Sequence, residues 1–93
     1  MASCKIGEFV KSKAGHDKDE IFIIIKIEDE YVYLVDGKSR ILDRPKKKKI
    51  KHIQIINQID EELQLKIDTN LILRDEDIKR AVKIYKQRNL GGC

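Results

Sequence analysis

The chain has 93 residues, 41% of them hydrophobic, and carries 20 Lys and Arg against 16 Asp and Glu, a net charge of +4. This length suits one compact domain with an attached tail, and the apolar content argues against wholesale disorder. The longest uncharged apolar run covers residues 21–25, far short of the ~20 residues of a membrane span, and no signal-peptide core follows the first residues, so we expect a cytoplasmic protein without a membrane partner.

Residues 6–56 have the pattern of short β-strands. They are rich in isoleucine, valine and tyrosine, and glycine or charged residues interrupt them at intervals of about ten residues. The first strand is expected at residues 5–11, and a polar turn, in which Gly15 supplies a positive φ, leads to the second at residues 20–27. Five such strands with no helix-length segment between them predict a small SH3-like or OB-like barrel over residues 1–57.

The third strand is expected at residues 31–35, where successive side chains project to opposite faces. The dipeptide Asp36-Gly37 follows at once. It favours a type I′ turn, because both central residues of that turn take a positive φ. We therefore expect residues 38–42 to pair back onto the third strand as the second arm of a hairpin.

Pro45 marks an expected break in the sheet, because proline has no N–H group for a ladder hydrogen bond. We expect residues 45–51, which include the four lysines of residues 46–49, to form an exposed connection near one end of the barrel. Residues 52–56 are apolar enough to return as the fifth strand and to close the barrel.

Residues 58–93 form the second predicted unit, a helical extension. Hydrophobic residues recur at every fourth position from Ile59 to Ile67, so a short helix is expected there. A longer helix is expected at residues 75–89, where acidic residues open the first turn, and Gly91 offers its C-terminal stop. Its apolar stripe consists of Ile78, Ala81, Val82 and Tyr85. We expect this stripe to pack on the barrel or on the other helix.

All of the excess positive charge lies in the first unit. Residues 1–57 hold 13 Lys and Arg against 9 Asp and Glu, whereas residues 58–93 hold 7 of each. Within residues 36–52, eight bases face only two carboxylates, which is the electrostatic footprint of a protein that binds a polyanion. The alternative interpretation of the lysine run is a solvated loop that keeps the protein soluble.

A second basic cluster surrounds Gly15. A glycine loop with several lysines brings backbone N–H and ammonium groups close to phosphate, and a Cβ at Gly15 would obstruct that approach. We expect both clusters to meet at one rim of the barrel. The expected RNA-binding residues are Lys11, Lys13, Gly15, His16, Lys18, Lys38, Arg40, Arg44, Lys46, Lys47, Lys48, Lys49 and Lys51. Tyr31 and Tyr33 are the candidates for stacking on bases, although packing is the commoner role of such residues.

Two segments resemble the KOW motif of ribosomal and transcription-associated proteins, in which a strand, a basic loop with one glycine and a second apolar strand begin an SH3-like barrel. They are GEFVKSKAGHDK at residues 7–18 and IFII at residues 21–24. Two further segments are similar to the barrel of a KOW-containing large-subunit ribosomal protein of archaea and eukaryotes, and more similar to small bacterial KOW-domain RNA-binding proteins. These are YVYLVDGK at residues 31–38 and PKKKKIKH at residues 45–52.

The resemblance, which covers about residues 5–57, implies a small SH3-like (KOW) barrel that binds RNA. It implies a non-enzymatic role in translation or ribosome assembly, with ribosomal RNA or a ribosomal subunit as the partner. The alternative is a protein–protein interaction module, because SH3-like barrels also dock peptides and the tail helix offers an apolar face for a partner.

We expect neither an enzyme nor a metal site. The two histidines and two cysteines show no motif-like spacing with one another or with carboxylates. Cys4 and Cys93 lie near opposite ends of the chain, which suits free thiols in a reducing compartment. No phosphate-loop or dinucleotide-binding fingerprint is present, so we expect no cofactor and no small-molecule substrate.

Overall fold

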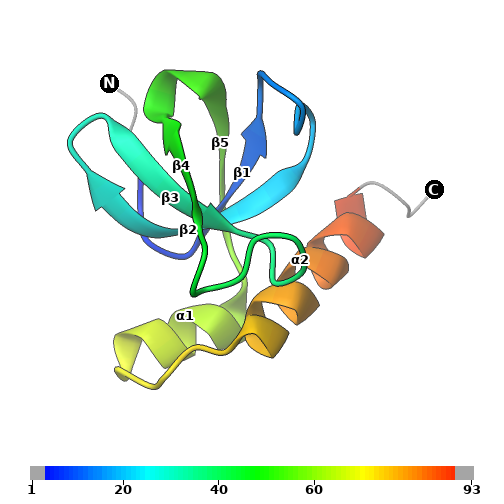
Figure 1. Cartoon of the computed structure of the whole chain (residues 1–93). Helices are drawn as coiled ribbons and strands as arrows, with labels where there is room; N and C mark the ends of the chain where they lie inside the picture. Colours follow the sequence, from blue (N-terminus) through cyan, green and yellow to red (C-terminus); the bar gives the residue numbers. More distant parts are fainter. Residues whose placement is uncertain (1–3, 90–93) are drawn as a thin grey trace.

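The structure is a computed structural model that describes residues 4–89, in which five strands precede two α-helices (Figure 1). The strands are β1 (Glu8–Ser12), β2 (Ile21–Glu28), β3 (Tyr31–Val35), β4 (Lys46–Lys49) and β5 (Ile53–Ile59), and a short 3-10 helix, η1 (Ile50–His52), joins the last two strands. The helices are α1 (Glu61–Asp68) and α2 (Asp75–Asn89). The prediction of a mainly β chain with C-terminal helices is confirmed, and the expected stop at Gly91 lies outside the described residues.

The strands form one open antiparallel sheet in the order β4-β3-β2-β1-β5, so β4 and β5 lie at its two ends. The register shifts at two places. One shift lies between Ile24 and Lys26 on β2, and the other lies between Glu8 and Val10 on β1. Such irregularities bend a strand and increase its twist, and the sheet is strongly curved in Figure 1.

Each face of the sheet carries a hydrophobic cluster, because alternate residues of a strand point to opposite faces. The inner cluster, on the concave face, consists of Val10, Phe22, Ile24, Val32, Leu34 and Ile53. The outer cluster consists of Phe9, Ile21, Ile23, Val35, Leu63, Ile78, Ala81 and Val82. Both helices contribute to the outer cluster, so α1 and α2 cover the convex face (Figure 1). The curvature of the sheet itself buries the inner cluster.

The apolar stripe of α2 packs on the sheet, as predicted. Ile78 and Ala81 are fully buried, Val82 is 6% exposed, and the ring of Tyr85 stacks on Phe9 with a centroid distance of 4.7 Å. These side chains are therefore part of the core rather than a free surface for a partner. None of the described helices is long and apolar enough to cross a membrane.

The predicted hairpin at Asp36-Gly37 is wrong. Residues 38–42 form no strand, and β3 pairs instead with β4, after a connection of residues 36–45. Gly37 has a φ of +79°, but Asp36 is not among the residues with positive φ, whereas a type I′ turn requires both. The two-residue hairpin joins β2 to β3, where Asp29 has a φ of +54°.

Gly37 is needed for a close approach between the connection and α2. A Cβ atom at this position would lie 2.5 Å from the backbone nitrogen of Lys79 and 2.6 Å from the backbone oxygen of Asp75. The connection is also tied to the helix by the backbone N–H of Leu42, which donates to Oδ1 of Asp75 at 2.7 Å. The Asp36-Gly37 signal therefore reflects a contact between distant parts of the chain.

The prediction that the lysine run forms an exposed connection is also wrong, because residues 46–49 are strand β4. Pro45 lies immediately before this strand, where its missing N–H removes no ladder hydrogen bond. Strand β4 is an edge strand, and lysine is a common residue at such edges because it discourages pairing with another chain. Lys46 and Lys48 also form ion pairs with the rest of the protein.

Candidate nucleic-acid interface

The basic loop between β1 and β2, residues 13–20, is held by its own polar groups. The hydroxyl of Ser12 lies 2.7 Å from Oδ1 of Asp17 and 3.0 Å from the carbonyl oxygen of Ala14. Gly15 has the expected positive φ, at +88°. A Cβ atom there would meet its nearest neighbours at 3.7 Å, an ordinary contact, so within the protein only the backbone conformation favours glycine.

Lys48 ties this loop to β4. Its Nζ donates to Oγ of Ser12 at 2.8 Å, to the carbonyl oxygen of Ala14 at 2.8 Å and to Oδ1 of Asp17 at 2.6 Å. Lys46 forms an ion pair with the other oxygen of the same carboxylate. The two basic stretches, more than 25 residues apart in sequence, are therefore in direct contact, as predicted. Asp17, however, neutralises two of the four lysines.

The Asp17 carboxylate is held in its charged form. Burial alone would raise the pKa of this carboxyl, but hydrogen bonds from Lys46, Lys48 and Ser12 outweigh it, so the pKa lies well below its usual range. The side chains of Asp17 and Lys48 are only 13% and 9% exposed. This cluster therefore links two segments of the protein, and the ammonium group of Lys48 is not available to a ligand.

The lysines of β4 alternate between the two faces of the sheet. Lys46 and Lys48 are paired with Leu34 and Val32, so they share the inner face with the inner cluster. Lys47 and Lys49 are paired with the two tyrosines of β3 on the outer face. Identical residues thus have different roles, set by the two-residue period of the strand.

Beyond the area that the helices cover, the outer face presents tyrosine rings beneath lysine side chains. Nζ of Lys47 lies 4.5 Å from the ring centroid of Tyr31 and 5.9 Å from that of Tyr33, and Nζ of Lys26 lies 5.2 Å from Tyr33. Such cation–π contacts contribute about 0.5–1 kcal/mol each at exposed sites. Both tyrosines are half-buried, so they pack against the lysines rather than stand free.

One end of the sheet carries a group of exposed bases that we call the basic rim. The backbone N–H of Lys13 donates to the carbonyl oxygen of His52 at 2.9 Å, so the basic loop lies beside η1. The members of the basic rim are Lys13, His16 and Lys18 of the loop and Lys51 and His52 of η1. Within residues 4–89 none of these side chains forms an ion pair. Two other predicted bases have weak partners: Lys11 lies 4.0 Å from Asp19, and Lys49 lies 3.8 Å from Glu30.

Three predicted site residues lie away from the basic loop, β4 and η1. Lys38, Arg40 and Arg44 are exposed on the connection of residues 36–45, which lies against α2. There Lys38 lines a groove of about 280 Å³ together with three bases outside the predicted site. These are Lys79, Lys83 and Lys86 of α2. Their spacing of four and three residues, which places them on one helix face, could have identified them.

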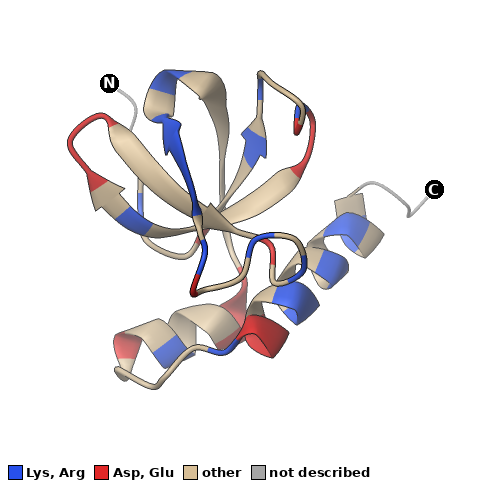
Figure 2. Cartoon of the chain, viewed as in Figure 1, with Lys and Arg blue, Asp and Glu red and all other residues tan. Residues whose placement is uncertain are grey.

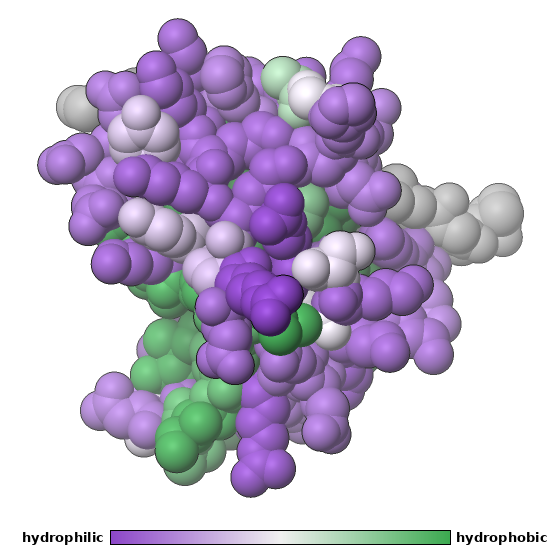
Figure 3. Space-filling model, viewed as in Figure 1, coloured by the Kyte–Doolittle hydropathy of each residue, from purple (hydrophilic) through white to green (hydrophobic). Residues whose placement is uncertain are grey.

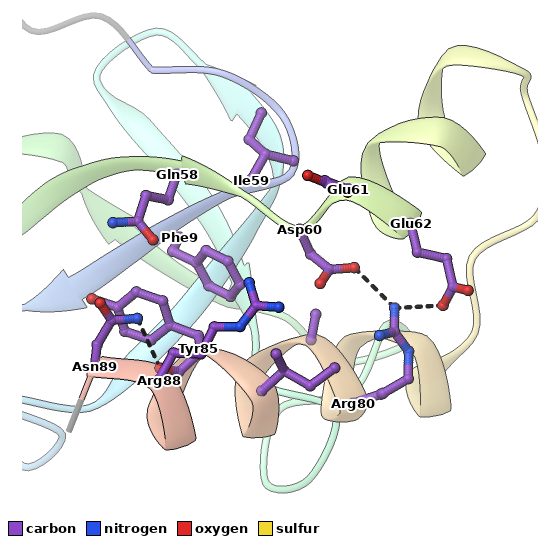
Figure 4. A pocket seen from close by; sticks show the side chains of 12 residues that line it. Phe9, Gln58, Ile59, Asp60, Glu61, Glu62, Arg80, Tyr85, Arg88 and Asn89 are labelled. Atoms are coloured by element: carbon purple, nitrogen blue, oxygen red, sulfur yellow. Dashed lines mark hydrogen bonds and ion pairs between the residues drawn. The ribbon is translucent and has the colours of Figure 1, made fainter. Parts of the chain in front are cut away.

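A second cavity, of about 340 Å³, lies between the β5–α1 junction and the other side of α2 (Figure 4). The guanidinium of Arg80 donates to Asp60 at 2.9 Å and lies 2.7 Å from a carboxylate oxygen of Glu62. Asp60 also caps α1 by accepting from the backbone N–H of Leu63. This cavity is therefore lined by charges that compensate each other, unlike the groove beside Lys38.

The chain fits no protein-family model, and no curated protein is significantly similar to it.

Proposed function

We propose that this chain is a non-enzymatic RNA-binding module that contacts the phosphates of structured RNA, with ribosomal RNA as the first candidate, in translation or ribosome assembly. The contact of the basic loop with β4 and η1 carries the proposal, because it gathers exposed bases from distant segments at one end of the sheet. A surface of this kind recognises charge and shape rather than base identity.

We also propose that the curved sheet is an SH3-like barrel of the KOW type. Four strands follow one another as a meander, and the fifth returns to pair with the first, which is the connectivity expected of such a barrel. The buried contact between Lys48 and Ser12 supports it, because side chains from β4 and β1, which are not neighbours in the sheet, meet there.

Sedimentation with purified ribosomal subunits tests the proposal. Three exposed lysines of the basic rim, Lys13, Lys18 and Lys51, and the exposed Lys47 of β4 are available for phosphates. With a slope of about −0.9 per contact, these four contacts alone should weaken binding about 150-fold when the salt is raised from about 50 to 200 mM. Treatment with ribonuclease should abolish co-sedimentation.

Matched variants separate the basic rim from overall charge. Lys13→Gln/Lys51→Gln removes two charges from the rim, and Lys5→Gln/Arg88→Gln removes two charges from exposed positions elsewhere. The rim variant should bind subunits about 30-fold more weakly at 0.15 M salt, because each lost contact costs about 5-fold, and the control should lose far less. Binding that is independent of salt, or equal loss in both variants, would contradict the proposal.

A protein-interaction module is the second candidate, favoured by an exposed apolar patch on α1 and the segment after it. Leu65, Leu71 and Ile72 are 61%, 58% and 85% exposed, and hydrophobic surface is visible over this part of the molecule in Figure 3. Such a patch is typical of contact surfaces. Capture of one partner that survives ribonuclease and is lost on Leu65→Ser/Ile72→Ser, without loss of ribosomal subunits, would favour this candidate.

A further inference from the structure

The groove beside α2 differs from the basic rim in position and construction. Lys79, Lys83 and Lys86 lie at positions i, i+4 and i+7 of the helix, so they form a row along one face, about 10 Å long at 1.5 Å per residue. Lys38 faces this row from the connection, and the floor includes the buried side chain of Val82. We call these four lysines the α2 row.

The positive charge of the α2 row exceeds the negative charge beside it, because four lysines and one carboxylate, that of Asp36, line the groove. Within the part of the chain that the structure describes, none of the four lysines forms an ion pair. Asp36 lines the groove, but its Oδ1 accepts the backbone N–H groups of Lys38 and Arg40. In the first turn of α2, Asp75 accepts from Leu42, and Asp77 pairs with Lys66.

The α2 row is held at a fixed position relative to β4. The contact of Gly37 with the backbone of α2 and the hydrogen bond from Leu42 to Asp75 fasten the connection to the helix. The same connection leads directly into β4. In Figure 2, Lys and Arg positions on β4, on the connection and on α2 are visible in the same view of the molecule, with acidic positions of the connection among them.

We propose that the α2 row binds the phosphate backbone of the same RNA that contacts the basic rim, so that α2 is a second RNA-binding element. This inference rests on the proposed function. A row of ammonium groups without an exposed aromatic ring can bind the phosphates of a phosphodiester chain through their charge, and it does not distinguish the bases. An acidic peptide is less well matched, because Val82 is only 6% exposed and offers no apolar anchor, and the large apolar residues that are more than half exposed lie on α1 and the segment after it.

Fluorescence anisotropy with a labelled RNA hairpin tests the inference, with the full chain titrated between about 50 and 200 mM salt. The test variant is Lys83→Gln/Lys86→Gln. The control is Lys5→Gln/Arg88→Gln, in which Arg88 belongs to the same helix but lines the opposite cavity (Figure 4). All four side chains are exposed, so both variants should fold, which circular dichroism verifies.

Relative to the wild type, the test variant should bind about 30-fold more weakly at 0.15 M salt, and its salt slope should be smaller by about 2. The control should bind RNA about as tightly as the wild type.

Three other outcomes would contradict the inference. If the wild type binds RNA and Lys13→Gln/Lys51→Gln weakens that binding, but the test variant behaves like the control, the inference fails and the proposed function stands. If the wild type binds no RNA, both fail. If polyglutamate of equal charge competes as well as RNA and loses affinity in the test variant, the α2 row is a docking site for acidic protein, and the inference also fails.

Discussion

The ion cluster of Asp17, Lys46 and Lys48 predicts an unusual order of stability among variants. Asp17→Ala leaves the Lys48 ammonium, 9% exposed, with only Ser12 and the carbonyl oxygen of Ala14 as partners. Removing one partner of a buried pair costs about 3–5 kcal/mol, and the lower value applies because these acceptors remain. For a domain of this size, about 3 kcal/mol corresponds to a decrease in Tm of roughly 12–24 °C.

Lys48→Met should cost less, about 1 kcal/mol, because Asp17 keeps the ion pair with Lys46 and the hydrogen bond from Ser12. The double variant Asp17→Ala/Lys48→Met should be more stable than Asp17→Ala alone, since it contains no unpaired buried charge. Urea denaturation followed by circular dichroism measures all four proteins. A double variant as unstable as the sum of the single variants would refute the reasoning.

The same cluster predicts a dependence on pH. The pKa of Asp17 is lower in the folded chain than its unfolded value of about 3.9. Its contribution is therefore complete at neutral pH and decreases as the pH falls below about 4. The difference in stability between the wild type and Asp17→Ala should be largest at pH 7 and smaller at about pH 3. A constant difference would show that the carboxylate does not act through its charge.

Two further substitutions test the packing of α2 by urea denaturation. Gly37→Ala should destabilise the protein by more than about 2 kcal/mol, because the positive φ is strained and the Cβ would lie 2.5 Å from the nitrogen of Lys79. Gly15→Ala, which combines a positive φ with ordinary contacts at 3.7 Å, should cost only about 1 kcal/mol. Equal effects would contradict the close approach at Gly37. Ile78→Ala should lower the free energy of unfolding by about 2–5 kcal/mol, because the Ile78 side chain is fully buried. The control, Leu65→Ala at a position 61% exposed, should change it by less than about 0.5 kcal/mol. A small effect at Ile78 would mean that α2 is not part of the core.

Most elements were predictable from local patterns. The third strand and the long helix lie at the expected residues 31–35 and 75–89, because alternation and helical spacing are properties of the neighbouring sequence itself. Strand β4 was not predictable, because four lysines have a low strand propensity and Asp36-Gly37 is a strong local hairpin signal. Contacts with Asp17 and with α2, both distant in the sequence, decide the structure there.

The candidate site was predictable only in part, for a similar reason. Counting bases located the loop and the lysine run, but it did not show that Asp17 neutralises Lys46 and Lys48. Residues 58–93 offered no signal in the count, because their acidic and basic residues are equal in number. They are separated in space, since the acids of α2 lie in its first turn and the groove lysines follow on one face.

Four identical residues cannot by themselves fix the register of β4 against β3. If β4 slid along β3 by one position, lysines would still stand opposite three of the four partners, Lys46 and Lys48 would exchange faces with Lys47 and Lys49, and most of the chemistry on each face would be unchanged. The alignment must therefore be imposed at the two ends of the run. At one end the backbone N–H of Ile50 donates to the carbonyl oxygen of Glu30 at 2.8 Å, and at the other Pro45 ends the ladder. We accordingly expect the residues that flank the run to tolerate replacement less well than Lys47.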